Sequence, residues 1–240
     1  MPARRNGTTP VRDVAKRIKR GRKAYIVPTE KNAHGFVAGE SFLERNHLLC
    51  FSLLEGLEQL WDQPVCIDLE NQNLVASRSD LPKKDGSRVA SYTADAKYQL
   101  EGGQIGVCES KPSAFVEKHA DRHAQAKKVL EKFGMTFFTL TEKRFTPVFI
   151  SNLENLKKAL SPAQKQNSEI AAQKIEFALQ RQNCWRTLDL KRVAGLSSAD
   201  IFFGLAYGLL SADMNELIFS ETAHVRAAHG SLDHLKFMEL

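Results

Sequence analysis

Two adjacent glycines, Gly102-Gly103, separate segments of strand-like composition at 88–100 and 104–110. A glycine pair favours a two-residue hairpin turn, because the turn types that match the twist of paired strands need residues with positive φ. The two segments are therefore expected to pair as antiparallel strands. This pairing constrains the fold strongly, since it fixes which residues of the two segments lie opposite each other.

Downstream of the hairpin, a long charged segment at 114–133 ends at a glycine, as helices commonly do. The residues at 135–140 read Met-Thr-Phe-Phe-Thr-Leu, which is typical of a short, largely buried strand. A strand that is reached through a crossover helix is expected to run parallel to its neighbour. The sheet predicted from this stretch is therefore mixed.

Upstream of the hairpin, leucines and phenylalanines recur at three- and four-residue spacing over 40–60, which predicts an amphipathic helix. Apolar and polar residues alternate over 64–77, which predicts a strand, and a polar Lys83-Lys84-Asp85-Gly86 turn follows it. Residues 40–145 thus predict the order α-β-β-β-α-β. The expected fold class is α/β, with a mixed-sheet core.

The composition changes after Pro147. Ser161-Pro162 is a good helix start, with Ser as the N-cap and Pro at the first helical position. Two short helices at 189–194 and 198–210, joined by a glycine turn, precede expected strands at 216–220 and 222–227, the pattern of a helix-turn-helix with a wing. The second of these helices has almost no polar side chains that could read bases. We therefore expect a mostly helical, winged-helix-like module that docks a partner.

Charge divides the chain further. The 240 residues carry a net charge of +6, yet residues 1–24 hold nine basic residues against one acid, a net charge of +8, which leaves about −2 for the remainder. Such a basic arm either contacts a phosphate backbone or is a solvated tail, and the charge alone does not decide between them. The expected domains are the arm at 1–24, a domain at 25–147 and a domain at 148–240. The candidate DNA-contacting residues lie on the arm and on the long charged helix: Arg17, Lys19, Arg20, Arg22, Lys23, Lys118, Arg122 and Lys127.

Several protein classes do not fit this sequence. No apolar run is long enough to cross a bilayer, and the basic N-terminus lacks the apolar stretch of a secretory signal. The four cysteines are widely scattered, which argues against a structural zinc site and for free thiols in a reducing cytoplasm. No phosphate-binding loop of the G-x-x-x-x-G-K type is present, which makes a self-contained nucleotide hydrolase a poor interpretation.

The hairpin brings together the residues that can carry chemistry. Asp95 precedes the glycine turn by about as many residues as Glu109 follows it, and Lys111 shares one strand face with Glu109. Two carboxylates suit a hard cation such as Mg²⁺, with Mn²⁺ able to take its place, and the carbonyl of Ser110 could add a further ligand. Lys111 could orient a water or offset developing negative charge. The alternative is a cross-strand surface salt bridge of little energetic value.

One other pair of ligand-type residues is set aside. His119 and His123 are four apart on the expected helix, a spacing that metal sites use. No glutamate or third ligand accompanies them in a recognisable pattern. We therefore interpret them as a pair that faces solvent or phosphate.

Asp95 with Glu109-Ser110-Lys111 resembles the core motif of the PD-(D/E)xK nuclease superfamily. Within it, an ordered set of motifs over residues 40–145 resembles the TnsA family, the endonuclease subunits of heteromeric cut-and-paste transposases. One departure is Ala94, where the family usually has a proline that shapes the backbone and is not a ligand. The motifs are Glu40-Ser41-Phe42-Leu43-Glu44-Arg45, Gln63-Pro64, Ser91-Tyr92-Thr93-Ala94-Asp95 and Gly134 to Glu142.

The resemblance implies a restriction-endonuclease-like core and adds Glu44 to the catalytic and metal-binding set of Asp95, Glu109, Ser110 and Lys111. It implies cleavage of the 5′ strands at transposon ends in a bacterial cytoplasm. The implied partners are double-stranded DNA, the DDE-type transposase TnsB, which cuts and joins the 3′ ends, and the AAA+ regulator TnsC, contacted through the C-terminal region. Two alternatives remain open: a stand-alone restriction or repair nuclease, and a DNA-binding scaffold whose site no longer cuts.

Overall fold

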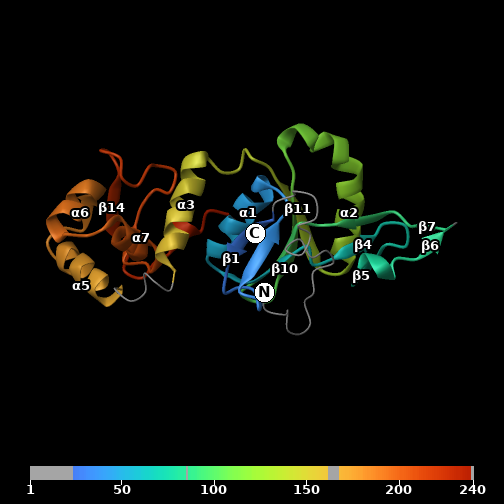
Figure 1. Cartoon of the computed structure of the whole chain (residues 1–240), viewed down its shortest axis with the longest axis horizontal. Coiled ribbons are helices and arrows are strands. Elements are labelled where there is room, and N and C mark those ends of the chain that lie inside the picture. The colour runs from blue at the N-terminus through green and yellow to red at the C-terminus, as the bar shows by residue number, and fades with distance from the viewer. Residues whose placement is uncertain (1–23, 85, 162–167, 239–240) are drawn as a thin grey trace. The chain divides into compact units, whose positions relative to one another are not determined.

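The structure is a computed structural model that describes residues 24–84, 86–161 and 168–238. Within these ranges the chain forms two compact units, both mixed α/β: an N-terminal unit of 24–52 and 56–144, and a C-terminal unit of 53–55 and 145–238 (Figure 1). The expected DNA contacts of the arm lie outside the described residues, and so does Pro162 of the expected helix start.

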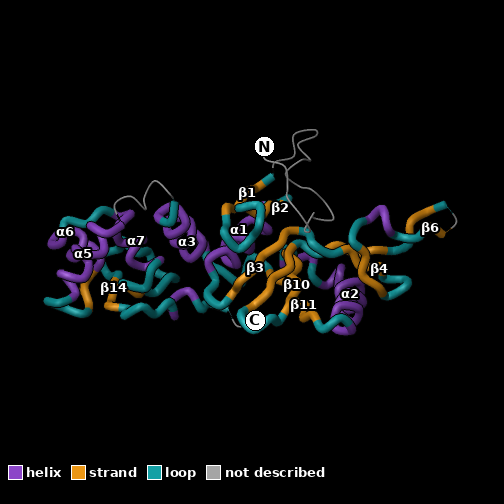
Figure 2. The backbone as a smooth tube through the Cα atoms, turned by 90° about the horizontal axis from the view of Figure 1, so that it is seen from below, coloured by secondary structure: helices purple, strands orange, loops and turns teal. Residues whose placement is uncertain are grey.

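A four-stranded mixed sheet forms the centre of the N-terminal unit, in the order β11-β10-β9-β3. Strand β10 pairs antiparallel with β9 and parallel with β11, as the glycine pair and the crossover helix predicted. The turn between β9 and β10 has three residues, Glu101 to Gly103, and not the two that were predicted, because Leu100 bonds to Gln104. Figure 2 labels β10 and β11, which are neighbours, and β3, which β9 separates from β10. The bounds are β3 Leu57–Asp62, β9 Ala96–Leu100, β10 Ile105–Ser110 and β11 Met135–Leu140.

A second, antiparallel sheet in the order β5-β4-β8 continues two strands of the first one. Strands β3 and β9 pair with each other, and after a short break their continuations β4 and β8 pair with each other as well. Two short hairpins, β1–β2 and β6–β7, complete the strands of this unit. The bounds are β1 Tyr25–Pro28, β2 Phe36–Gly39, β4 Cys66–Asp68, β5 Asn73–Val75, β6 Lys83–Lys84, β7 Ser87–Arg88 and β8 Ser91–Thr93, with a 3-10 turn η1 at Arg78–Asp80.

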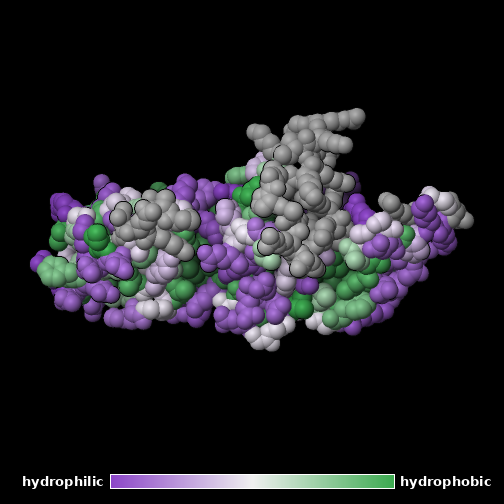
Figure 3. Space-filling model, turned by 60° about the horizontal axis from the view of Figure 1, so that its bottom comes forward, coloured by the Kyte–Doolittle hydropathy of each residue, from purple (hydrophilic) through white to green (hydrophobic). Residues whose placement is uncertain are grey.

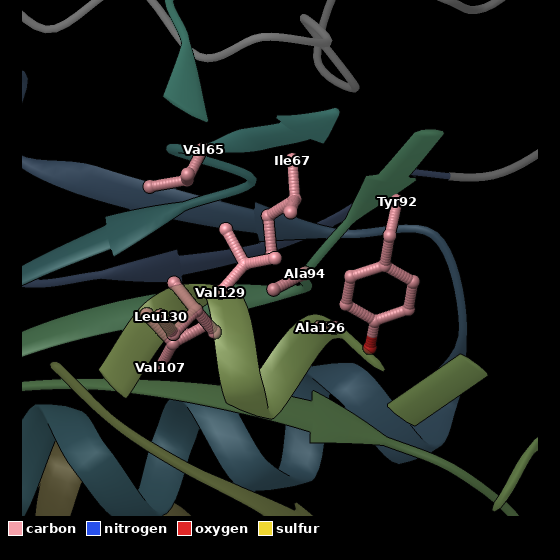
Figure 4. Close-up of a cluster of buried hydrophobic side chains, with 8 residues drawn as sticks. All are labelled: Val65, Ile67, Tyr92, Ala94, Val107, Ala126, Val129 and Leu130. Atoms are coloured by element: carbon pink, nitrogen blue, oxygen red, sulfur yellow. The ribbon is translucent and has the colours of Figure 1, made fainter. Parts of the chain in front are cut away.

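Two helices cover opposite faces of the main sheet. Helix α1, Phe42–Leu53, places Phe51 against Tyr98 of β9, with ring centroids 5.5 Å apart. Helix α2, Ala120–Lys132, packs Ala126, Val129 and Leu130 on the other face, where Val107 of β10 and Tyr92 of β8 complete a buried cluster (Figure 4). Because Val107 and its neighbour Gly106 point to opposite faces, Gly106 lies beneath Tyr98, where an added Cβ would overlap the ring.

The helix expected over 40–60 was wrong in its second half. Helix α1 ends at Leu53, and Leu57 to Asp62 form strand β3. Leu57 and Leu60 continue the helical spacing of α1, so periodicity alone assigns them to the helix. Gly56, with φ of 77°, is the signal that the chain turns there.

The strands expected at 64–77 and 88–100 are each interrupted. The first divides into β4 and β5, and the second into β7, β8 and β9. Asp62 lies opposite Ala96 and Cys66 lies opposite Thr93, so three residues on one side of the ribbon face two on the other. This is a β-bulge, and Gln63, with φ of 42°, lies in it.

The helix expected at 114–133 starts later than predicted. Two single 3-10 turns, η2 at Ser113–Phe115 and η3 at Glu117–His119, precede α2. Its end was predicted correctly, because Gly134 follows the last turn with φ of 70°.

The C-terminal unit packs helices on a three-stranded antiparallel sheet in the order β12-β14-β13. Its core combines aliphatic and aromatic side chains of α3, α5, α6 and α7 with buried residues of the strands and loops, such as Leu210, Ile218 and Val225. Helix α7 approaches α5 closely at Gly204, where a Cβ would lie 2.9 Å from Ile175. The bounds are α3 Pro147–Ala159, α5 Ser168–Leu179, β12 Cys184–Arg186, α6 Thr187–Ala194, α7 Ser198–Ala206, β13 Leu210–Ser211 and β14 His224–Ala227, with a 3-10 turn η4 at Asp233–Leu235.

Two helices joined by a glycine turn were predicted here, and α6 and α7 confirm that pattern, but the second helix ends at Ala206 and not at Leu210, which begins β13. Gly195 ends α6 in the left-handed conformation, and a capping box of Ser197 and Asp200 starts α7. Residues 216–220 are not a strand, and 222–227 is a strand only from His224. Helix α3 was not predicted, although Thr146 as N-cap and Pro147 at the first helical position give the same signal that was recognised at Ser161.

Candidate active site

Asp95 lies in the break between β8 and β9, at the bulge. Its backbone carbonyl accepts a hydrogen bond from the N–H of Gln63 at 2.8 Å, and its side-chain Oδ2 accepts one from the N–H of Ser110 at 2.8 Å. The residue is half-buried. Because the sheet ends here and the chain changes partner, the Asp95 side chain is held across from β10 at the point where the ladder stops.

Glu109 is a buried carboxylate on the adjacent strand, with 4% of its surface exposed. Its Oε2 accepts a hydrogen bond from the hydroxyl of Tyr92 at 2.7 Å, and its Oε1 pairs with Nζ of Lys111 at 2.7 Å. The ion pair therefore runs along one strand and is largely buried. It is not the cross-strand surface bridge that was the alternative interpretation.

Glu44 approaches the site from the first turn of α1. Its backbone N–H donates to Oγ of Ser41, while its carboxylate accepts from that hydroxyl at 2.9 Å and from the N–H of Glu40 at 2.7 Å, in the manner of a capping box. Gly39 makes room for this turn, since a Cβ there would lie 2.9 Å from Cβ of Glu44. Burial raises the pKa of Glu44, and the negative charges of Glu40 and Glu109 raise it further.

The three carboxylates influence one another. Burial raises the pKa of Asp95 well above its usual range, and the negative charges of Glu109 and Glu44 add to this, against the Ser110 N–H and the Lys111 ammonium. The negative charge around Asp95 is therefore only partly compensated by the positive groups nearby. A cation bound among them would relieve this repulsion.

The backbone of Ser110 also faces Asp95. The N–H of Lys111 donates to the carbonyl of Leu140 on β11, and a trans peptide directs the Ser110 carbonyl the opposite way, toward the side of Asp95. The N–H of Ser110 already bonds to Asp95 on that side. Two side-chain carboxylates and one carbonyl therefore converge on one edge of β10.

This oxygen set fits a hard divalent cation. Among the described residues, no group of three or more His, Cys, Asp and Glu side chains is arranged to hold a metal ion. Mg²⁺, however, is commonly bound through one or two carboxylates and keeps several waters. Asp95, Glu109 and the Ser110 carbonyl match that requirement. The oxygens of Glu109 are engaged by Tyr92 and Lys111, and those of Glu44 by the helix cap, so each of these two carboxylates would bind a cation through its remaining lone pairs.

Two residues at this site were missed by sequence reasoning. Tyr92 holds Glu109, and His47 of α1 lies 2.8 Å from Oγ of Ser110 through its Nδ1. His47 follows Glu44 by three residues, so the two share a helix face, and that spacing could have drawn attention to it. Tyr92 precedes Asp95 by three residues on the other side of a strand break, and nothing in the local pattern links it to Glu109.

The interpretation of the histidine pair on α2 was wrong for His123. Its side chain is 7% exposed and packs edge-on against Tyr92, with ring centroids 5.7 Å apart. It belongs to the apolar support behind Glu109. His119 stacks on it at 5.9 Å and is half-buried.

The three expected DNA contacts of the long charged helix have different surroundings in the structure. Arg122 lies over the ring of Tyr92 at 5.7 Å and donates to the backbone carbonyl of Ser91, so part of its role is structural. Lys118 is exposed on η3. Lys127 is exposed and lies 3.8 Å from Glu131, one turn along α2.

Comparison with known proteins adds no relative. No protein-family model matches the chain, and no curated protein is significantly similar to it. None of the helices in the described ranges has the length and apolar character that crossing a membrane requires.

Proposed function

We propose that this chain is a Mg²⁺-dependent DNA endonuclease of the TnsA type, which cleaves the 5′ strands at transposon ends. The proposal rests on the convergence of Asp95, Glu109 and Lys111 at one strand edge. There, burial and the negative charges of two other acids raise the pKa of Asp95. An ion pair that only stabilises a surface does not require several acids gathered at one strand edge.

The division of roles follows from the contacts. Asp95, Glu109 and the Ser110 carbonyl would hold the cation, which would supply charge stabilisation at the scissile phosphate and a lower pKa for an attacking water. The Lys111 ammonium, already at the edge of the carboxylate pair, orients that water or offsets charge on the phosphate. Tyr92 keeps Glu109 in place. Glu44 adds negative charge from α1.

The fold supports the same proposal. A mixed sheet between α1 and α2, with the acids at the ends of β8 and β10, is compatible with a restriction-endonuclease-like core. In the C-terminal unit the order β12-α6-α7-β13-β14 is that of a winged helix, but α7 buries Ile201, Phe202 and Phe203. This favours a role in docking a protein partner, which in the TnsA family is TnsC, over a role in recognising DNA bases. TnsB would place the chain at the DNA end.

The second candidate function is a stand-alone restriction or repair nuclease with the same chemistry. It differs only in what delivers the DNA. A scaffold that binds DNA without cutting is the third candidate, and the pKa of Asp95 argues against it, because a site released from catalysis has no reason to retain mutually repelling acids.

The experiment measures Mg²⁺-dependent strand cleavage of transposon-end DNA by the full chain, with and without a DDE-type transposase. The test variant is Asp95→Asn, which keeps the shape and the acceptor for the Ser110 N–H. Asp80→Asn, an exposed aspartate on η1, is the matched control. Loss of 5′-strand cleavage in Asp95→Asn alone supports the proposal. Equal cleavage by wild type and Asp95→Asn overturns the catalytic assignment, and cleavage of arbitrary DNA without a partner favours the stand-alone nuclease.

A further inference from the structure

His47 connects three segments of the candidate site. It lies on α1 one turn after Glu44, with 2% of its surface exposed. Its Nδ1 is 2.8 Å from Oγ of Ser110 at the end of β10, and its ring is also hydrogen-bonded to the backbone carbonyl of Thr141, just after β11. The imidazole therefore joins the helix that carries Glu44 to the ends of two parallel strands.

The two contacts define the protonation of the ring. A carbonyl can only accept, so one ring nitrogen must donate a proton to Thr141. The ring is 2% exposed, and burying a charged imidazolium is costly, so the ring is taken as neutral with a single N–H. The nitrogen that faces Ser110 is then an acceptor, and the Ser110 hydroxyl donates to it. The contacts thus select the tautomer with the proton on Nε2.

This geometry does not suit a serine nucleophile. A general base must pass the proton on to the reacting group, and this imidazole is 2% exposed and is held between the Ser110 hydroxyl and the Thr141 carbonyl. The Ser110 hydroxyl also lies beside buried acids, where an alkoxide would be repelled. The bond from Ser110 to His47 therefore serves to hold Ser110.

Ser110 is the residue on which the site depends most. Its N–H bonds to Asp95, its carbonyl faces the same side, and its two chain neighbours are Glu109 and Lys111. The bond to His47 fixes its side chain from α1. We propose that His47 is a positioning residue that acts through Ser110 to hold the Glu109–Lys111 strand and the Glu44 helix in the arrangement that binds the metal. This inference rests on the proposed function for the metal itself.

The experiment compares Mn²⁺ affinity, measured on the full chain without DNA, with thermal stability measured without metal. His47→Leu removes both hydrogen bonds at similar volume, and Ser110→Ala removes only the hydroxyl. We expect a 10- to 100-fold weaker Mn²⁺ affinity in each, as is typical when a group that orients metal ligands is lost. The double variant should be no weaker than the worse single one, because both remove the same link. His47→Asn, whose side-chain oxygen can accept from Ser110, should recover most of the affinity.

Ser52→Ala is the matched control, since it removes another buried hydrogen bond of α1, to the carbonyl of Leu49, away from the site. It should lower the melting temperature slightly and leave the Mn²⁺ affinity unchanged. Unchanged Mn²⁺ affinity in a folded His47→Leu variant, or additive losses in the double variant, would overturn the inference.

Nitrogen NMR of the imidazole gives a readout that needs no metal. The Nε2-protonated tautomer is expected in the wild type, and a switch to the other tautomer is expected in Ser110→Ala only if Thr141 releases the ring. The opposite tautomer in the wild type overturns the inference. If the wild type shows the expected tautomer but binds no Mn²⁺, the proposed function fails while the link between His47 and Ser110 stands.

Discussion

The two units of this chain differ in what they bury. Of the buried polar and charged residues in the described ranges, nine lie in the N-terminal unit and two, Asn152 and Thr187, in the C-terminal unit. All of the ionisable ones, such as Glu109 and His47, are in the N-terminal unit. In the C-terminal unit Arg186 of β12 and Arg192 of α6 stay at the surface, where both pair with Asp189. On the face shown in Figure 3, hydrophilic residues cover much of the described surface of both units.

The contrast indicates that activity and stability depend on residues of different units. Burying a charge costs free energy unless it is paired, whereas apolar packing is the main source of stability. The N-terminal unit accepts this cost at one strand edge, where the acids also repel each other. The C-terminal unit shows the pattern of a packed scaffold. Different substitutions should therefore affect activity in one unit and stability in the other.

The largest effect is expected for Asp95→Asn. Loss of a cation ligand should lower the rate of DNA cleavage by about 10³-fold, which corresponds to roughly 4 kcal/mol. The metal-free protein should become more stable at pH 7, because the raised pKa means that the ionised carboxylate destabilises the folded state above the unfolded-state pKa. The melting temperature is expected to rise by roughly 2–4 °C or more. A lower melting temperature would show that Asp95 is a stabilising group, like the surface acids of the other unit.

The next effect is expected in the scaffold. Ile201→Ala truncates a fully buried side chain of α7 and should destabilise the C-terminal unit by about 2–5 kcal/mol. Urea unfolding followed by Trp185 fluorescence checks this. The control is Leu217→Ala, at a leucine that is 56% exposed, where the change should be within about 0.5 kcal/mol. If both variants unfold at the same urea concentration, α7 is not the core of its unit.

Tyr92→Phe sharpens the comparison within the N-terminal unit. It leaves one oxygen of the buried Glu109 carboxylate without its donor, which should cost about 1.5–3 kcal/mol. Cleavage should fall about 10- to 100-fold, because Glu109 loses its orientation. Tyr207→Phe, at an exposed tyrosine of the C-terminal unit, should change neither quantity. Full cleavage by Tyr92→Phe would mean that Lys111 alone positions Glu109.

A pH effect is expected in the C-terminal unit. The Nε2–H of His234 donates to the carbonyl of Leu205 at 2.9 Å, its Nδ1 is buried without a partner among the described residues, and burial lowers its pKa. A depressed histidine pKa means that the unfolded chain binds the proton first. Stability of this unit should therefore be full above about pH 6.5 and fall as the pH drops below it. His234→Gln should flatten that decline in acid unfolding curves, and an unchanged decline would assign it to other groups.

The smallest effect is expected for Arg192→Gln. Its ion pair with Asp189 joins side chains that are 80% and 27% exposed, and such pairs contribute about 0–1 kcal/mol. Urea unfolding at low and high salt checks this. A loss above about 1 kcal/mol that vanishes with salt would show that the surface charges of this unit matter more than its packing indicates.

The sequence predicted those parts of the fold and site that depend on local pattern. Strands β10 and β11 and their parallel pairing follow from the alternation and the crossover helix, and the shared face of Glu109 and Lys111 follows from the strand period. The separation of β3 from α1 was not predictable from periodicity, because Leu57 and Leu60 fit both elements. The hydrogen bonds of Tyr92 and His47 join residues far apart in sequence, and no local pattern specifies them.

The bulge at Gln63 has a consequence for how this site tolerates change. The extra residue between Asp62 and Cys66 is what offsets β4 and β8 from β3 and β9 and places Asp95 at the break, where its carbonyl accepts from the N–H of Gln63. Deleting one residue from 63–65 would restore a continuous ladder. A shift of one residue along a strand turns its side chains to the opposite face of the sheet. A point substitution near Gln63 keeps the carboxylate aimed at Ser110, whereas a one-codon deletion would redirect it. Length, more than residue identity, is therefore the property that this connection must preserve.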